Sequence, residues 1–250
     1  MLIFDDGTFS EDSTFLLTDY LARTPKDVMG KNFRVDQRVF DSLSENEKYI
    51  FQGTLPGSLE DDRKKVVSSK TRFVHRMLEQ RPLKFPGGEV RITDTSNFPV
   101  SKTVSAAHVT INPGCLREMH WHPNADEWSF FIRGHARVTI FAAAGAARTF
   151  NYVAGDVGIV LKNNAHYVEN IGDEPVEMLE MFRAPRFEDF STEQWLAQTP
   201  ATMVAEHLNL TGSNREKFMN GLSREKVPVK GPLRKTRSMS DMSKALEEIL

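Results

Sequence analysis

The sequence lacks the features that mark several broad classes of protein. Its 250 residues include one cysteine, Cys115, which excludes an intrachain disulfide framework and a cysteine-rich zinc site. No apolar run approaches the roughly 20 residues that span a bilayer, and the first residues have neither the basic region nor the apolar run of a secretory signal. Neither sign of charge predominates, because 32 basic residues stand against 34 acidic ones. We therefore expect no nucleic-acid partner, no membrane partner, and a location that is cytoplasmic or left undetermined by the sequence.

The hydrophobic content of 40% is enough for a sizeable core, and from about residue 73 to 182 it is arranged as short strands. Runs rich in Val, Ile, Phe and Thr alternate there with Gly, Pro and Asn. The runs with this pattern are 90–92, 106–111, 128–132, 136–141, 157–160, 167–170 and 176–182. Strands at this spacing, without helical periodicity between them, predict a mainly β sandwich or barrel.

Helical patterns flank the β region on both sides. Residues 14–50 have apolar residues at helical spacing, with a helix start at Thr24-Pro25 and a third stretch around Val39. After Phe182, Ser191 with Gln194 three positions later is a capping-box signature. Residues from 226 onward are basic and rich in serine, which predicts a flexible tail with a short amphipathic end.

One segment of the N-terminal region recurs about 175 residues later. Asp19–Pro25 reads DYLARTP and Gln194–Pro200 reads QWLAQTP, and a strand-like run ending in phenylalanine precedes each. The simplest account, set against chance similarity of helix boundaries, is a duplicated protein whose first barrel is absent from this sequence. We therefore expect five parts: the end of a preceding domain with its helical cap (1–50), a linker (51–72), a β-barrel (73–189), a helical cap (190–225) and a tail (226–250).

Four potential metal ligands lie in the β region. His120 and His122 are two residues apart, so on a strand both imidazoles face the same side. Glu127 follows a turn-forming stretch, and His166 comes after a further strand and turn. Three imidazoles and one carboxylate suit a mid-row divalent ion such as manganese or iron, with zinc, nickel and copper as alternatives.

The spacing of these residues resembles the two sequence motifs of the cupin superfamily. Gly114, the four ligand candidates and Gly134 occupy the motif positions, and Asn170 ends the second motif. Leu161 and Asn163 replace the proline and glycine that the family has in the turn before the last histidine. The resemblance implies a cupin β-barrel of the jelly-roll type, also called a double-stranded β-helix, with flanking α-helical caps.

Longer stretches resemble the C-terminal cupin of bicupin oxalate decarboxylases. They are Trp121–Trp128, Ala147–Val157 and His166–Pro175, and residues 5–14 are similar to the loop that follows that family's N-terminal barrel. The resemblance covers nearly all of residues 1–225. It implies a manganese-dependent, dioxygen-requiring cleavage of oxalate to formate and carbon dioxide, in a protein that forms homo-oligomers.

Two further residues are candidates for catalysis. Glu180 lies between apolar residues on the last long strand, where burial should raise the pKa of a carboxyl group and suit it to donate a proton. Arg117 lies three residues before His120, and its guanidinium suits a dianionic substrate. Both match residues that the family uses in these roles. The alternatives are a structural carboxylate and a surface ion pair.

Other positions carry weaker expectations. Glu11 matches the lid glutamate of the family's N-terminal site, although Asp12 replaces the usual asparagine, and without its barrel it is expected to be an idle loop residue. Phe187 stands where relatives often have tyrosine. The cysteine and the remaining histidines are expected to be structural or solvated: Cys115, His75, His108, His135 and His207.

Three functions are compatible with the sequence. The first is oxalate decarboxylation, with Arg117 binding the substrate and Glu180 protonating the product. The second is oxalate oxidation to carbon dioxide and hydrogen peroxide, which is expected if no acid is correctly placed. The third is a metal-binding cupin fragment with little activity of its own.

Overall fold

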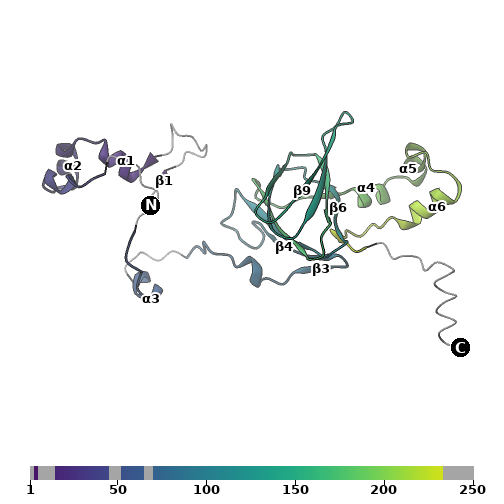
Figure 1. Ribbon diagram of the computed structural model, residues 1–250, viewed down its shortest axis with the longest axis horizontal. Helices are drawn as coiled ribbons and strands as arrows, with labels where there is room; N and C mark the ends of the chain where they lie inside the picture. The colour runs from purple at the N-terminus through teal and green to yellow at the C-terminus, as the bar shows by residue number, and fades with distance from the viewer. Residues whose placement is uncertain (1–2, 5–14, 45–51, 65–69, 233–250) are drawn as a thin grey trace. The chain divides into compact units, whose positions relative to one another are not determined.

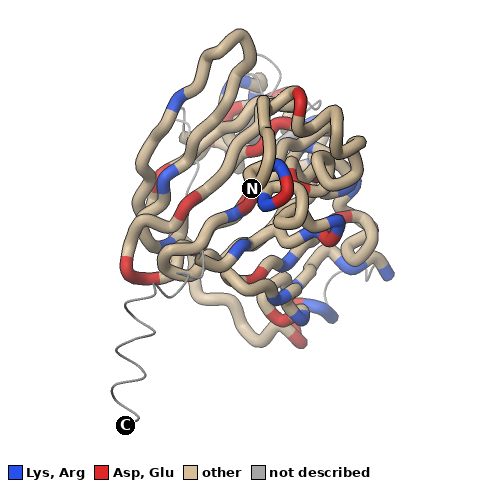
Figure 2. Tube along the Cα trace, turned by 90° about the vertical axis from the view of Figure 1, so that its right-hand side faces the viewer, with Lys and Arg blue, Asp and Glu red and all other residues tan. Residues whose placement is uncertain are grey.

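The computed structural model describes residues 3–4, 15–44, 52–64 and 70–232. The chain divides into two compact units, residues 1–68 and 69–250. Figure 1 shows the elements of both units. Among the described residues no helix is long and apolar enough to cross a membrane. Basic and acidic residues are interspersed along the trace in Figure 2, as the balanced composition predicts.

The first unit contains short elements. Its elements are β1 (Ile3–Phe4), β2 (Phe15–Leu16), α1 (Leu17–Ala22), α2 (Lys26–Phe33), the 3-10 turn η1 (Gln37–Phe40) and α3 (Leu59–Arg63). Strands β1 and β2 pair antiparallel, and α2 begins directly after Pro25, as predicted. The third helix expected around Val39 is instead a single 3-10 turn, which Asp36 caps by accepting a hydrogen bond from the Arg38 amide. The stretch expected to be a linker at 51–72 includes α3, capped by Ser58.

The second unit is built on two antiparallel sheets. The first has the order β10-β7-β12-β5-β4-β3, and the second has the order β13-β6-β11-β8-β9, with β14 added against β6. The strands of the first sheet are β3 (Leu83–Phe85), β4 (Gly88–Thr93), β5 (Ser105–Ile111), β7 (Glu127–Arg133), β10 (Val157–Val160) and β12 (Val176–Phe182). Those of the second are β6 (Leu116–Trp121), β8 (Ala136–Phe141), β9 (Ala147–Tyr152), β11 (Ala165–Asn170), β13 (Phe190–Ser191) and β14 (Val229–Lys230).

The two sheets pack face to face through one buried apolar cluster. Val109 and Met178 contribute from the first sheet, and Val138 and Val168 from the second. The alternating burial along β12 explains this, because every second residue from Val176 to Phe182 faces inward. The predicted mainly β, jelly-roll fold is therefore confirmed. The expected barrel is corrected in one respect, since among the described strands none pairs across the two sheets, which are not closed into a barrel.

Helices follow the β region as predicted. They are α4 (Thr192–Gln198), α5 (Ala201–His207) and α6 (Gly212–Gly221), and the short 3-10 turn η2 (Met77–Glu79) precedes β3. Ser191 caps α4 by accepting a hydrogen bond from the Gln194 amide, which confirms the capping signature. The segment expected to be a tail from 226 differs from that expectation, since β14 pairs with β6 and Val229 is fully buried. The rest of that expected tail, from 233, lies outside the described residues.

Two turns depend on a residue at a motif position that has a positive φ angle. Gly134 lies between β7 and β8 at φ +84°, and a Cβ there would come within 2.7 Å of the Pro175 carbonyl oxygen. Asn163, which replaces the family's glycine before His166, has φ 65°. Asparagine is among the few side chains that tolerate this left-handed conformation. The turn before the last ligand is thus kept without glycine.

Candidate metal centre

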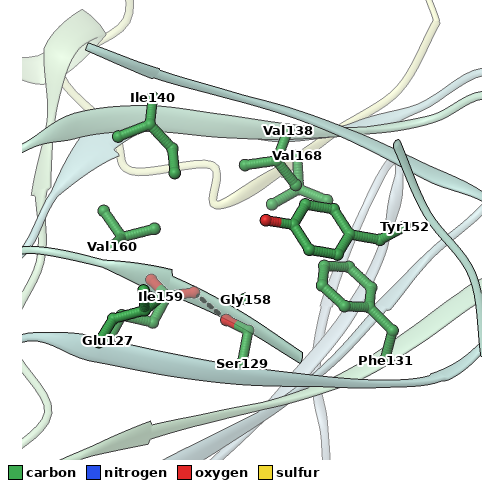
Figure 3. A pocket seen from close by; sticks show the side chains of 10 residues that line it. All are labelled: Glu127, Ser129, Phe131, Val138, Ile140, Tyr152, Gly158, Ile159, Val160 and Val168. Carbon is green, nitrogen blue, oxygen red and sulfur yellow. Dashed lines mark hydrogen bonds between the residues drawn. The ribbon is translucent and has the colours of Figure 1, made fainter. Parts of the chain in front are cut away.

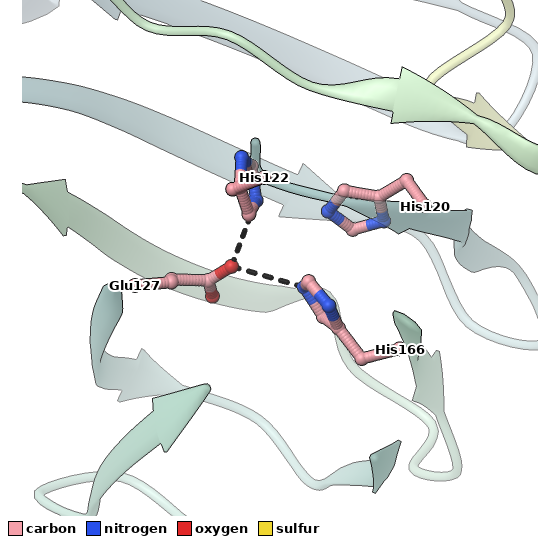
Figure 4. A group of neighbouring side chains, drawn as sticks. All are labelled: His120, His122, Glu127 and His166. Atoms are coloured by element: carbon pink, nitrogen blue, oxygen red, sulfur yellow. Dashed lines mark hydrogen bonds and ion pairs between the residues drawn. The ribbon is translucent and has the colours of Figure 1, made fainter. Parts of the chain in front are cut away.

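The four predicted ligands come together from three strands (Figure 4). His120 lies on β6 and His122 directly follows it, while Glu127 begins β7 after the turn and His166 lies on β11. His166 pairs directly with His120 across the β6–β11 ladder. One ligand atom from each residue lies within 4.8 Å of the others, and all four side chains are buried.

A backbone carbonyl orients each of the three imidazoles. Nδ1 of His120 donates to the carbonyl of Glu118 at 2.6 Å, Nδ1 of His122 to Glu188 at 2.7 Å, and Nδ1 of His166 to Asn164 at 3.0 Å. A carbonyl oxygen can only accept, so the proton of each neutral ring lies on Nδ1. Every Nε2 therefore presents a lone pair toward the other ligands, the arrangement by which proteins hold a metal-binding histidine.

The donor set fits a divalent cation. Nε2 of His122 and Nε2 of His166 each lie 3.0 Å from the same oxygen of Glu127. With the proton on Nδ1, these contacts bring lone pairs against a carboxylate, which is favourable only when a proton or a cation lies between them. Nε2 of His120 is buried without a hydrogen-bond partner in the described residues. An ion bound to all four groups would satisfy each of these atoms.

The electrostatic environment keeps the ligands ready to bind a cation. Burial, the charge of Arg117 and the neighbouring imidazoles lower the pKa of His120 well below its ordinary value. Burial alone would raise the pKa of Glu127, but the adjacent His166 and His122 hold it well below its ordinary value. The neutral imidazole and the ionised carboxylate are the forms that ligate metal.

A serine behind Glu127 completes the support of the carboxylate. Ser129, two residues along β7 on the same face, donates its hydroxyl to the second oxygen of Glu127. Behind this pair lies an apolar cavity of about 10 Å³ (Figure 3). Val138, Ile140 and Phe131 contribute to its wall. Its volume suits one water-sized molecule, so it is not a pocket for a dicarboxylate.

A β-bulge places Arg117 in the same interior as His120. In a regular strand, residues three apart face opposite sides. The pairing of β11 with β6 moves from His166 opposite His120 to Val168 opposite Arg117, so three steps on β6 match two on β11. The extra residue re-aims the strand, as bulges do beside functional sites. Arg117 therefore turns inward, where its charge acts on His120.

Arg117 is fully buried between two carboxylates. Its Nη2 donates to Asp189 at 2.7 Å, and its Nε lies 3.6 Å from Oε1 of Glu180. Burial opposes the charged form, but Asp189 and Glu180 together raise the pKa of Arg117 above its ordinary value. Nε and Nη1 have no hydrogen-bond partner in the described part of the chain. The alternative of a surface ion pair does not fit a side chain that is 2% exposed.

Glu180 faces inward on β12, opposite Ser129 of β7. It is fully buried, and neither carboxylate oxygen has a hydrogen-bond partner among the described residues. Burial first, and then the charges of Glu127 and Asp189, raise the pKa of Glu180 to about 8, against the opposing effect of Arg117. A carboxyl group with this pKa is protonated at neutral pH and can donate a proton.

The residues with weaker expectations lie partly beside the metal centre and partly away from it. Phe187 packs edge-on against His122, with ring centroids 5.6 Å apart, so it covers the ligand without offering a hydroxyl. Glu11 and Asp12 lie outside the described residues. His108 pairs with Glu177 at 2.8 Å and His75 with Gln80 at 2.9 Å, while Cys115 is buried in the core.

The sequence analysis missed three residues that support the site. Ser129 carried a usable signal, because it lies two residues after Glu127 on a strand and shares its face. Asp189 and Lys226 carried none, since they reach the site only through contacts between distant parts of the chain. Asp189 is 72 residues from Arg117, and Lys226 is 37 residues from Asp189.

A family model and the curated relatives agree on the family to which this chain is similar. The family model described as Cupin matches residues 75–216. Oxalate decarboxylase OxdC of Bacillus subtilis (strain 168) is 52% identical over 231 residues, which is 92% of this chain and 59% of that protein. A probable oxalate decarboxylase of Arthroderma benhamiae is 37% identical over 214 residues, covering 84% of this chain and 53% of the relative.

Solved structures agree with the sequence comparisons. A structure of the Bacillus subtilis oxalate decarboxylase at pH 4.6 matches with a TM-score of 0.79 at 51% identity, over 92% of this chain and 59% of the other. A second structure of that enzyme, which concerns its Mn(II) centres, matches with a TM-score of 0.78 at 51% identity, over 91% of this chain and 60% of the other. The chain thus spans between half and 60% of the length of these relatives.

Proposed function

The chain belongs to the cupin family, and we propose that it cleaves oxalate to formate and carbon dioxide with manganese at its metal centre. The relatives' names and the Mn(II) centres of the Bacillus subtilis enzyme support this choice of substrate and metal. Dioxygen belongs to the proposal as a required co-reactant, as the resemblance implies. The observation that carries the proposal is the buried carboxyl group of Glu180, which lies 3.6 Å from Arg117 and has no hydrogen-bond partner among the described residues.

The stoichiometry of the reaction explains why this acid matters. Cleavage of the carbon–carbon bond of oxalate to formate and carbon dioxide consumes one proton and involves no net oxidation. The proton must be delivered to the carbon atom that loses carbon dioxide. A protonated Glu180 facing the ligand cluster can supply it, and solvent then reprotonates the carboxylate.

The other residues bind and orient the substrate. A bound divalent cation supplies positive charge and open coordination positions that a carboxylate oxygen of oxalate can occupy. Two nitrogens of Arg117, Nε and Nη1, have no hydrogen-bond partner among the described residues and can bind the second carboxylate by charge-assisted hydrogen bonds. Phe182 and Phe187, packed against His122, keep water away from one side of the site.

Glu180→Gln tests the proposal. Glutamine keeps the size of the side chain but cannot cycle a proton, so formate production should fall by about 100-fold or more, while metal content stays that of wild type. Residual turnover should shift toward carbon dioxide and peroxide, because oxalate that is cleaved without protonation is oxidised to two carbon dioxide molecules while dioxygen takes the two electrons and becomes hydrogen peroxide. Formate, peroxide and metal are measured together on the manganese-loaded protein.

Glu177→Gln is the matched control, because it makes the same chemical change on the same strand at a half-buried position paired with His108. It should leave formate production near wild type. Formate yields equal to wild type in Glu180→Gln would show that Glu180 is not the proton donor. Peroxide as the main product of wild type would favour the oxidase alternative, and no oxalate consumption by metal-loaded protein would favour the non-catalytic one.

A further inference from the structure

Lys226 begins the C-terminal segment that the sequence suggested was a tail, yet it reaches into the support of the metal centre. Its Nζ donates to the carboxylate of Asp189 and, at 3.0 Å, to the backbone carbonyl of the same residue. The segment is anchored just beyond it, since Val229 is fully buried and pairs with Arg117 in the β14–β6 ladder. Lys226 is therefore held in place by an element of the sheet.

Asp189 receives two cations. Its side chain is 4% exposed, and one carboxylate oxygen accepts from Arg117 while the other accepts from Lys226. Burial would raise the pKa of Asp189, but Arg117 and Lys226 lower it to about 2, so it remains ionised. A buried carboxylate shared by two cations leaves the group of three with a net positive charge.

This net positive charge affects how strongly Arg117 attracts an anion. If Asp189 had Arg117 as its one cationic partner, the buried pair would be neutral and would attract an anion weakly. With Lys226 present, the group formed by Arg117, Asp189 and Lys226 has a net charge of +1. Nε of Arg117 approaches the buried Glu180 at 3.6 Å, and neither Nε nor Nη1 has a hydrogen-bond partner among the described residues, so donors of the guanidinium remain available in the interior.

Lys226 also fastens the backbone beside the ligands. The carbonyl of Glu188, which orients His122, immediately precedes Asp189, whose own carbonyl accepts from Lys226. Phe190 and Ser191 then pair with Trp121 and His120 on β6. Lys226 thus holds the stretch of chain that contains both Asp189, which binds Arg117, and the Glu188 carbonyl, which orients His122.

We propose that Lys226 is a positioning residue for the metal centre: by binding Asp189 it keeps Arg117 oriented and leaves its positive charge available to a small carboxylate anion. The inference rests on the proposed function only in taking the ligand to be a carboxylate. Lys226 binds the carboxylate oxygen of Asp189 that Arg117 does not, and it need not touch the anion.

Titration of formate into manganese-loaded protein, followed by the Mn(II) electron paramagnetic resonance spectrum, measures the effect without turnover. Lys226→Met should weaken formate binding by about tenfold, because Asp189 then compensates Arg117 alone. Lys226→Arg should restore most of the affinity. Metal stoichiometry should stay that of wild type, since the four ligands are unchanged.

Lys230→Met is the matched control. Lys230 has nearly the same exposure, 29% against 30%, and lies in the same segment, but its ion pairs are with Glu193 and, at 3.8 Å, with Glu118 instead of Asp189. Its loss should leave formate affinity unchanged. Lys226→Gln is carried alongside, and melting temperatures of all variants are compared, so that loss of folding in one variant does not remove the test.

A double variant separates positioning from simple structural support. Asp189→Asn removes the charge that Lys226 balances while keeping an acceptor for Arg117. Lys226→Met in the Asp189→Asn background should therefore bind formate about as well as wild type, a rescue that lost packing would not produce. Formate affinity unchanged by Lys226→Met, or no rescue in the double variant, would overturn the inference. Normal formate binding by a wild type that does not consume oxalate would overturn the proposed function alone.

Discussion

Three backbone carbonyls decide which ring nitrogen each histidine offers at the metal centre. Glu118, Glu188 and Asn164 each accept from an Nδ1–H, and so every Nε2 is left as the ligand atom. Single residues also explain the acid: burial and the charge of Glu127 raise the pKa of Glu180, and together they outweigh the opposing effect of Arg117 at 3.6 Å. Individual side chains therefore provide both the metal ligands and, at Glu180, the proton.

The ligand assignment predicts the effect of removing two imidazoles. Wild type grown with manganese should contain one divalent ion per chain, and His120→Ala combined with His166→Ala should contain close to none, because two nitrogen ligands are lost. Elemental analysis of the purified proteins measures this. His75→Ala combined with His207→Ala, which removes two histidines outside the cluster, should keep the metal. An unchanged ion content in the first double variant would refute the site.

The raised pKa of Glu180 predicts a pH dependence of stability. Its folded-state pKa of about 8 lies above the ordinary 4.5, so the folded state of metal-free protein holds a proton that the unfolded state releases between these values. Its contribution to stability is full below about 4.5 and is lost as pH rises toward 8. Glu180→Gln has no such proton. Its stability relative to wild type should therefore increase with pH, by at most about 1.4 kcal/mol per pH unit, in urea unfolding.

At the scale of elements, the turns and one bulge position the site. The bulge in β6 lets Arg117 and His120 share an interior although they are an odd number of residues apart. The repeated sequence is also a repeated structure: β2, α1 and α2 follow one another as β13, α4 and α5 do, with Thr-Pro between the helices. The duplication inferred from seven-residue stretches is thus matched by the order of elements.

Gly134 provides a prediction at this scale. Gly134→Ala should destabilise the protein by about 2 kcal/mol or more, because the new Cβ meets both the left-handed φ penalty and the backbone of Pro175 and Val176. Gly114→Ala is the control, since Gly114 has a similar φ of +68° but open space around the new Cβ. Thermal unfolding should show the larger loss at Gly134. Equal losses would mean that the close approach contributes nothing.

At the scale of the whole molecule, exposed apolar side chains remain on the helical caps. Trp195 is 60% exposed and Met203 61% exposed on α4 and α5, while Val28 and Phe33 on α2 are 48% and 50% exposed. Exposed apolar groups gathered on one element are typical of association surfaces. We therefore expect the exposed faces of α2, α4 and α5 to contribute to the surfaces of a homo-oligomer.

Sedimentation tests the association. Wild type should sediment as a dimer or larger oligomer at about micromolar concentration, since association would bury the apolar side chains that remain exposed on the caps. Met203→Glu places a charge on the exposed face of α5 and should shift the distribution toward monomer, whereas Glu206→Gln on the same helix should not. A stable wild-type monomer at that concentration would contradict the expectation.

The sequence by itself predicted the ligand set. The two-residue spacing of His120 and His122 on a strand is a local pattern, whereas His166, 39 residues from Glu127, was included because its spacing resembles the second cupin motif. Alternation along β12 likewise predicted that Glu180 shares a face with Met178 and Phe182, and the packing of the two sheets decided that this face is the buried one. Only the tertiary structure decided that Arg117 is held by Asp189 and that Lys226 holds Asp189, because these charges come from segments 72 and 37 residues apart. Local periodicity reports which way a side chain points, but which charges share a buried, weakly screened space depends on how distant strands pack together.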